Sequence, residues 1–138
     1  MDQQQIRFNF LEEAEDCFHT IESALLDARF SSGVPETLDL ALRATHSVKG
    51  GAAMMGFIPL SNVAHRLEDF FKILRIHHHS TQISTEIETL LLLGLDGMRK
   101  ISNLYLQGTE VEETWLKKNI EPIFTQLSQY LGEIQEED

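Results

Sequence analysis

The chain has 138 residues, the length of one domain, and its 42% hydrophobic and 24% charged residues exclude disorder as the overall state. A net charge of −11 disfavours binding to nucleic acid, which requires a basic surface. No signal peptide is visible, and no apolar run approaches the roughly 20 residues that span a bilayer. The single cysteine, Cys17, fits a reducing compartment. We therefore expect a cytoplasmic protein with no direct membrane insertion.

Apolar residues recur at steps of three and four in five segments, and none shows the alternation of a strand. These segments span residues 11–25, 41–55, 60–74, 83–105 and 116–130. Each places an apolar stripe on one helix face, and the short connections make successive helices antiparallel neighbours. The predicted fold is all-α: an up-down antiparallel four-helix bundle with an additional C-terminal fifth helix. We expect one domain over residues 1–132, followed by an acidic tail or the start of a linker at 133–138.

Turn and cap signals lie between these segments. Pro35 suits the first turn of the second helix. Gly56 can end that helix, and Pro59 can begin the third. The polar residues at 80–82 and 84–85 offer caps for the fourth.

The charge is unevenly distributed along the chain. Residues 40–79 contain five Lys or Arg and only two Asp or Glu, so they carry +3 while the rest carries −14. Five of the six histidines also fall in this segment. An anionic ligand is therefore tolerated best here. The run His77, His78 and His79 has no assigned role, and we interpret it as a solvated helix end where cations are favoured.

A motif within the second predicted helix begins at His46. Lys49 lies three residues further and projects to the same side, which places a fixed positive charge beside the imidazole. Two glycines inside a helix cost about 1 kcal/mol each relative to alanine, so their presence requires a compensating role. Gly50, Gly51 and Ala53 are predicted to keep the surface beside His46 low enough for a partner to dock.

The third predicted helix supplies the rest of the candidate site. Because each helical residue rises about 1.5 Å, counting from the intervening turn places His46 level with Glu68, and Lys49 level with His65. His65 and Glu68 are three residues apart and share a face. The sequence thus predicts a cluster of these four side chains. In it, Glu68 can accept the Nδ1 proton of His46, which leaves the Nε2 lone pair outward as a nucleophile.

These residues resemble a histidine phosphotransfer (HPt) domain, most closely the N-terminal phosphotransfer (P1) domain of CheA-type chemotaxis histidine kinases. The specific resemblance covers the stretch from His46 to Asp69, and elsewhere it rests on the helix pattern. It implies that His46 is the phosphoacceptor and that Lys49 contacts the phosphoryl group or the nucleotide. It also implies that Glu68 orients the imidazole and that His65 completes the network.

The resemblance implies two protein partners. In this family the histidine takes phosphate from ATP bound to a separate histidine kinase catalytic domain and passes it to an aspartate of a response regulator receiver domain. We therefore expect ATP as an indirect donor and no bound cofactor. The chain has neither a Walker motif nor a kinase signature, so catalysis by this domain alone is not expected. It can be part of a CheA-type kinase or a free-standing phosphorelay protein.

A metal-binding bundle and a scaffold bundle are the alternatives from other classes. Carboxylate-bridged di-iron bundles use Glu-x-x-His on two helices, and the nearest pattern here is a single Asp16-x-x-His19. There is no Cys pair for zinc, so we expect no metal. A scaffold would explain the apolar stripes but not the placement of His46, Lys49 and the glycines.

Overall fold

A computed structural model describes residues 2–77 and 82–137, with side chains as far as residue 132. His78 and His79, and the proposed cap residues at 80 and 81, lie outside the described residues. The described part contains helices and no strand. The helices are α1 (Gln3–Leu26), α2 (Ala28–Ser31), α3 (Pro35–Met55), α4 (Ile58–His77), α5 (Thr85–Leu106), α6 (Glu113–Asn119) and α7 (Glu121–Glu137).

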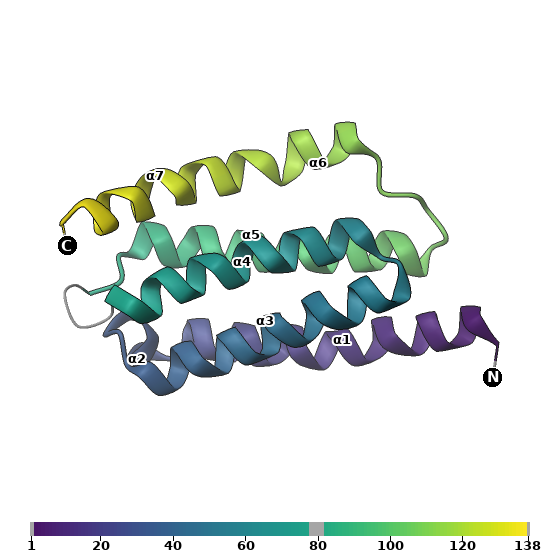
Figure 1. Cartoon of the computed structure of the whole chain (residues 1–138), viewed down its shortest axis with the longest axis horizontal. Coiled ribbons are helices and arrows are strands. Elements are labelled where there is room, and N and C mark those ends of the chain that lie inside the picture. Colours follow the sequence, from purple (N-terminus) through teal and green to yellow (C-terminus); the bar gives the residue numbers. More distant parts are fainter. Residues whose placement is uncertain (1, 78–81, 138) are drawn as a thin grey trace.

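The long helices lie side by side along the long axis of the molecule (Figure 1). α3 packs against α1 and α4, and α5 packs against α1 and α4 on the other side, which closes the four-helix bundle. α7 adds a further layer over α4 and α5. The predicted all-α fold is thus confirmed. None of the helices in the described part is both long enough and apolar enough to cross a membrane.

The predicted apolar stripes form the core. Every stripe residue of α1 is buried, and so is every stripe residue of α4. The largest fully buried aromatic side chains come from four different helices and are Phe18, Phe30, Phe71 and Phe124. Burial of such a side chain is worth roughly 1.5–3 kcal/mol, so this shared core holds the helices in register.

The short helix α2 was not anticipated from the sequence. Its N-cap is Asp27, whose carboxylate accepts a hydrogen bond of 2.9 Å from the backbone N–H of Arg29. Phe30 anchors this single turn in the core, where its ring packs edge-on against Phe71 at a centroid separation of 6.3 Å. Four residues are too few to produce a helical period in a sequence, so the pattern could not reveal this turn.

The predicted fifth helix is interrupted, because α6 and α7 are separated at Ile120. Pro122 has no N–H to donate, and its ring clashes with the carbonyl four residues earlier in a continuous helix. Beyond the break, Phe124, Leu127 and Leu131 are the buried residues. Ile123 and Tyr130, which we expected in the core, are only partly buried. The backbone of α7 continues to Glu137, so residues 133–137 are helical where we expected a tail.

The turn between α3 and α4 positions the candidate site. Gly56 adopts φ 79°, a left-handed conformation that glycine accommodates without strain, and its N–H donates back to α3. Phe57 N–H donates to Ala52 O at 2.8 Å, which completes the helix-ending motif. Arg7 of α1 reaches this turn: its Nε donates to Met55 O at 3.0 Å, and its guanidinium lies 4.4 Å from the centroid of the Phe57 ring. The α3–α4 turn is therefore held both by its own backbone hydrogen bonds and by Arg7 of α1.

Candidate functional site

The centre of the site is a contact between His46 on α3 and Glu68 on α4. His46 Nδ1 lies 2.5 Å from Glu68 Oε2. Because a carboxylate can only accept, Nδ1 carries a proton, and in the neutral form of the ring the free lone pair is therefore on Nε2. The His46 side chain is 68% exposed, whereas that of Glu68 is 2% exposed. Thr45 and Val48 beside it point into the core. The level matching of His46 with Glu68 is thus confirmed as a contact.

Two ammonium groups approach the other oxygen of the same carboxylate. Lys49 Nζ donates to Glu68 Oε1 at 2.7 Å, and Lys72 Nζ lies 3.7 Å from that oxygen. A further bond ties the two helices together here, because Ser61 Oγ of α4 donates to Lys49 O of α3 at 2.9 Å. Sequence reasoning missed Lys72, although its position four residues after Glu68 on one helix was an available signal.

These contacts determine the charge of Glu68. Burial acts to raise the pKa of its carboxyl, because a charged group loses solvation in the core. The hydrogen bonds from Lys49 and His46, together with the charges of Lys49 and Lys72, outweigh burial and hold the pKa below its usual value. Glu68 is therefore ionised at neutral pH, which is the state that can orient the protonated Nδ1 of His46.

Exposure alone does not distinguish His46 from other histidines. His19 on α1 is 66% exposed with Glu15 at 3.8 Å, and His65 on α4 is 58% exposed with Asp69 at 3.7 Å. Both of those carboxylates are about half exposed and contact their histidines only through a long ion pair. Of these three pairs, only that of His46 has a buried carboxylate at hydrogen-bonding distance. The orientation of its ring is therefore fixed more firmly than that of the other two.

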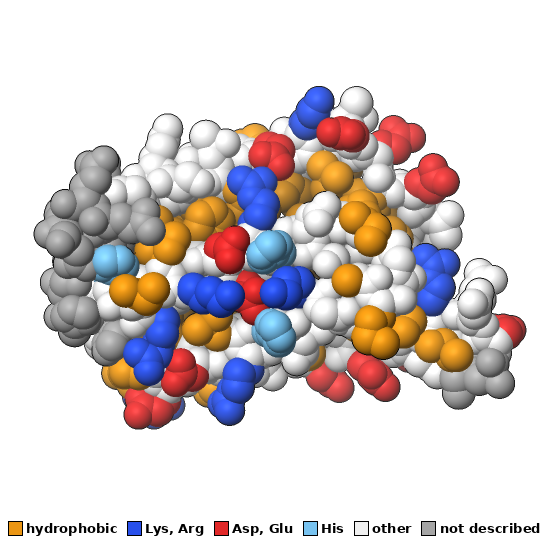
Figure 2. All heavy atoms as spheres, in the orientation of Figure 1, with side chains coloured by type: hydrophobic (Ala, Val, Ile, Leu, Met, Phe, Trp, Pro, Cys, Tyr) orange, Lys and Arg blue, Asp and Glu red, His pale blue; other side chains and the backbone are white. Residues whose placement is uncertain are grey.

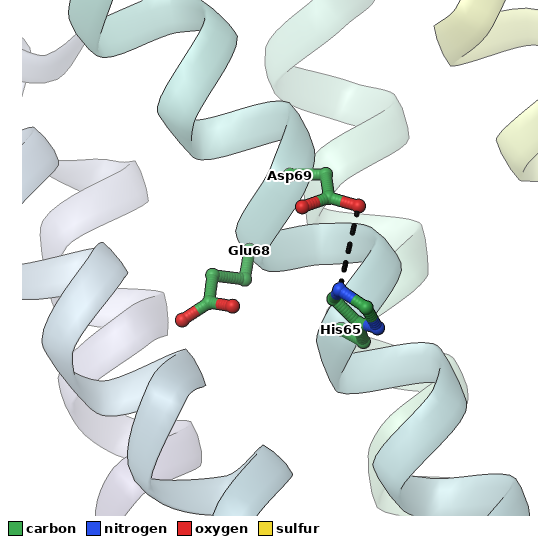
Figure 3. A group of neighbouring side chains, drawn as sticks. All are labelled: His65, Glu68 and Asp69. Atoms are coloured by element: carbon green, nitrogen blue, oxygen red, sulfur yellow. Dashed lines mark ion pairs between the residues drawn. The ribbon is translucent and has the colours of Figure 1, made fainter.

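His65 does not join the hydrogen-bond network that the sequence predicted for it. Figure 3 shows its ring turned toward Asp69 on the same helix, whereas Glu68 extends away from this pair. His65, Glu68 and Asp69 each offer a possible ligand atom within 4.8 Å of the others, a spacing suited to a metal ion. However, both oxygens of Glu68 already accept hydrogen bonds from Lys49 and His46. The ammonium groups of Lys49 and Lys72, at 2.7 and 3.7 Å from Glu68, would repel a cation, so this cluster does not favour a metal.

The site lies on an open surface. Figure 2 shows histidine and cationic side chains gathered around an acidic side chain in the middle of the face where α3 and α4 lie. Gly50 is exposed, and a Cβ placed on it would have no neighbour within 4 Å. Ala53, one turn further along α3, is also exposed. These two residues leave low surface beside His46, as the docking hypothesis requires.

Gly51 has a different position from the one predicted. A Cβ there would overlap the ring of Phe10 on α1, so this glycine permits close packing between α1 and α3. It is therefore removed from the predicted docking surface. Consecutive residues of a helix are about 100° apart, which explains how Gly50 faces solvent while Gly51 faces a neighbouring helix.

Comparison with known proteins assigns the class. Residues 5–102 match the family model described as the Hpt domain, and the chain belongs to that family of phosphotransfer domains in two-component signalling.

The chain is also similar to three proteins called chemotaxis protein CheA. That of Rhizobium meliloti is 29% identical over 82% of this chain and 15% of its own length. That of Salmonella typhimurium is 33% identical, over 73% of this chain and 15% of its own length. That of Klebsiella aerogenes is 34% identical, over 70% of this chain and 14% of its own length. The chain thus spans about a seventh of these relatives.

Proposed function

We propose that His46 is the phosphoacceptor of this domain. The Nε2 lone pair attacks the γ-phosphorus of ATP, a nitrogen–phosphorus bond forms, and the bond to the β-phosphate oxygen breaks with its electron pair leaving on ADP. The proton on Nδ1 stays in the hydrogen bond to Glu68. The single observation that carries the proposal is the 2.5 Å contact between that nitrogen and a buried carboxylate, made by a histidine side chain that is itself 68% exposed.

The neighbouring residues have distinct proposed roles. Glu68 fixes the tautomer and stabilises the positive charge that the ring acquires when it is phosphorylated. Lys49, 2.7 Å from Glu68 and one turn from His46, contacts the incoming phosphoryl group. Gly50 and Ala53 allow a partner to approach the imidazole closely. No cofactor is bound by the domain itself; ATP is bound by the partner that donates the phosphate.

The proposed partners are a histidine kinase catalytic domain, which supplies the phosphate, and a receiver domain of a response regulator, whose aspartate accepts it. The chain lacks a nucleotide-binding motif of its own, and the similar proteins are CheA proteins several times its length. These observations favour a role as one domain of a chemotaxis-type kinase over a free-standing phosphorelay protein. Since ATP is the phosphate source, we place the reaction in the cytoplasm.

The proposal is tested by labelling the domain with a CheA-type kinase domain and ATP carrying radioactive γ-phosphate. We expect one phosphate per chain, and the label should be released in acid but retained in base, because a phosphorylated imidazole nitrogen is a phosphoramidate. Subsequent addition of a receiver domain should move the label to that protein. An acid-stable label would indicate a phosphate ester of a hydroxyl side chain, and a label lost in both acid and base would indicate an acyl phosphate; either result would contradict the proposal.

The two adjacent glycines provide a separate test of the docking surface. Gly50→Leu should stay folded, with a melting temperature at or above that of the wild type, because leucine favours a helix and its side chain enters open space. It should slow phosphotransfer by about ten- to a hundredfold by preventing close approach. Gly51→Leu should instead lower stability by about 1–3 kcal/mol, because the new side chain collides with Phe10. Thermal unfolding and transfer kinetics of both variants check this, and wild-type transfer by Gly50→Leu would contradict the docking role.

A further inference from the structure

Two ammonium groups lie near the single negative charge of Glu68. Lys49 donates to Oε1 at 2.7 Å, and His46 contacts Oε2. Lys72 lies 3.7 Å from Oε1, beyond hydrogen-bonding distance, on an oxygen that already has a closer ammonium group. The same carboxylate oxygen therefore has two ammonium groups near it, and only Lys49 is at hydrogen-bonding distance.

Lys72 is also the cation of this cluster that can move. Its side chain is 57% exposed, whereas that of Lys49 is 26% exposed. Two other cations of α4 have close partners elsewhere: Arg66 donates to Glu121 at 2.8 Å, and Arg75 donates to Asp39 at 2.8 Å. A long ion pair at an exposed site stabilises the fold little, so the position of Lys72 needs another explanation.

We propose that Lys72 is a second phosphoryl-binding residue, whose ammonium group leaves Glu68 and contacts the phosphoryl oxygens when they arrive on His46 Nε2. The inference rests on the proposed function of His46. A phosphoryl group adds about two negative charges, and Lys49 alone cannot balance both while it also holds Glu68. Lys72 supplies the missing charge without disturbing the hydrogen bond that orients the ring. Lys49 then contacts both the carboxylate and the phosphoryl group, whereas Lys72 contacts the phosphoryl group alone.

The first experiment measures the initial rate of phosphorylation by a kinase domain and ATP, and repeats it with phosphoramidate, a small donor that needs no docking. Lys72→Gln should slow both reactions by about three- to tenfold, and Lys72→Arg should restore most of the rate. The matched control is Lys100→Gln on α5, because Lys100 is 60% exposed and pairs at 3.3 Å with Asp96, which lies four residues earlier on the same helix. This control should react at the wild-type rate. The deficit of Lys72→Gln should shrink at about 0.5 M salt, where screening is strong.

A second measurement separates contact with phosphate from an indirect effect through Glu68. The side-chain amine signal of Lys72 in NMR spectra should shift when His46 is phosphorylated, and that of Lys100 should not. In the unphosphorylated Lys72→Gln variant, the nitrogen shifts of the His46 ring should match the wild type. An altered tautomer in that variant, an unmoved Lys72 signal, or a wild-type rate with both donors would each overturn the inference. If wild-type His46 accepts no label at all, the proposed function itself has failed.

Discussion

Replacing His46 by glutamine is expected to abolish phosphorylation of the domain completely. Glutamine retains an N–H group that can still donate to Glu68, but it has no nucleophilic nitrogen to accept phosphate. The fold should remain intact, because the His46 side chain is largely exposed and the residues that pack beside it, Thr45 and Val48, are unchanged. Labelling with a kinase domain and ATP, beside a thermal unfolding curve, measures both effects.

Matched controls come from the other exposed histidines. His19→Gln and His65→Gln remove imidazoles of similar exposure that also lie near a carboxylate. Both variants should accept label in the same amount as the wild type. Full labelling of His46→Gln would show that the phosphate is carried by a different residue, and loss of labelling in either control would show that the effect is not specific to His46.

The second large effect is expected at Glu68. Glu68→Gln keeps the shape of the side chain but removes the charge, so the hydrogen bond from Nδ1 becomes weaker, and the amide N–H can instead donate to an unprotonated Nδ1. Phosphorylation should slow by about 100-fold. The ring nitrogen shifts of His46 should change toward the tautomer with the proton on Nε2, which is a direct readout of lost positioning. The control is Asp69→Asn, which removes the neighbouring exposed carboxylate that contacts His65. If Glu68→Gln and Asp69→Asn both react at the wild-type rate, Glu68 does not orient the nucleophile.

The same variant has a defined pH signature in stability. Because Lys49 and His46 hold the pKa of Glu68 below its usual value, ionised Glu68 stabilises the folded state. This contribution is complete above the unfolded carboxyl pKa of about 4.3, and it is lost as pH falls through the folded pKa. At pH 7 the wild type should be more stable than Glu68→Gln by about 1–3 kcal/mol. Melting curves recorded from pH 7 to pH 3 should show this difference narrowing below about pH 4.3.

Counting residues along two helices was enough to predict the central contact of the site. His46 and Glu68 lie at nearly equal distances from a short turn, and the rise per residue is constant, so their heights along the bundle follow from the sequence. The apolar stripes predicted which faces of α1 and α4 are buried, because burial of apolar area dominates helix packing.

Direction around the helix axis was harder to predict than height. His65 and Glu68 share a broad face, yet one contacts Asp69 and the other reaches α3. Gly50 and Gly51 differ by one residue and face different surroundings. Such differences depend on where the neighbouring helices cross, and that is set by packing of side chains from distant parts of the chain. The break at Ile120 was visible in principle, since Pro122 cannot continue a helix, but the apolar spacing concealed it.

The number of residues in the turn at Gly56 determines whether Glu68 faces His46. His46 lies ten residues before this glycine, or about 15 Å along α3. Its side-chain partner is Glu68 on α4 and not a residue of the turn. One inserted residue would nevertheless turn Glu68 by about 100° relative to its partner. Arg7 and Phe57 hold the turn in place at that distance. Evolution can therefore vary the composition of this connection more freely than its number of residues, although no residue in it takes part in the transfer.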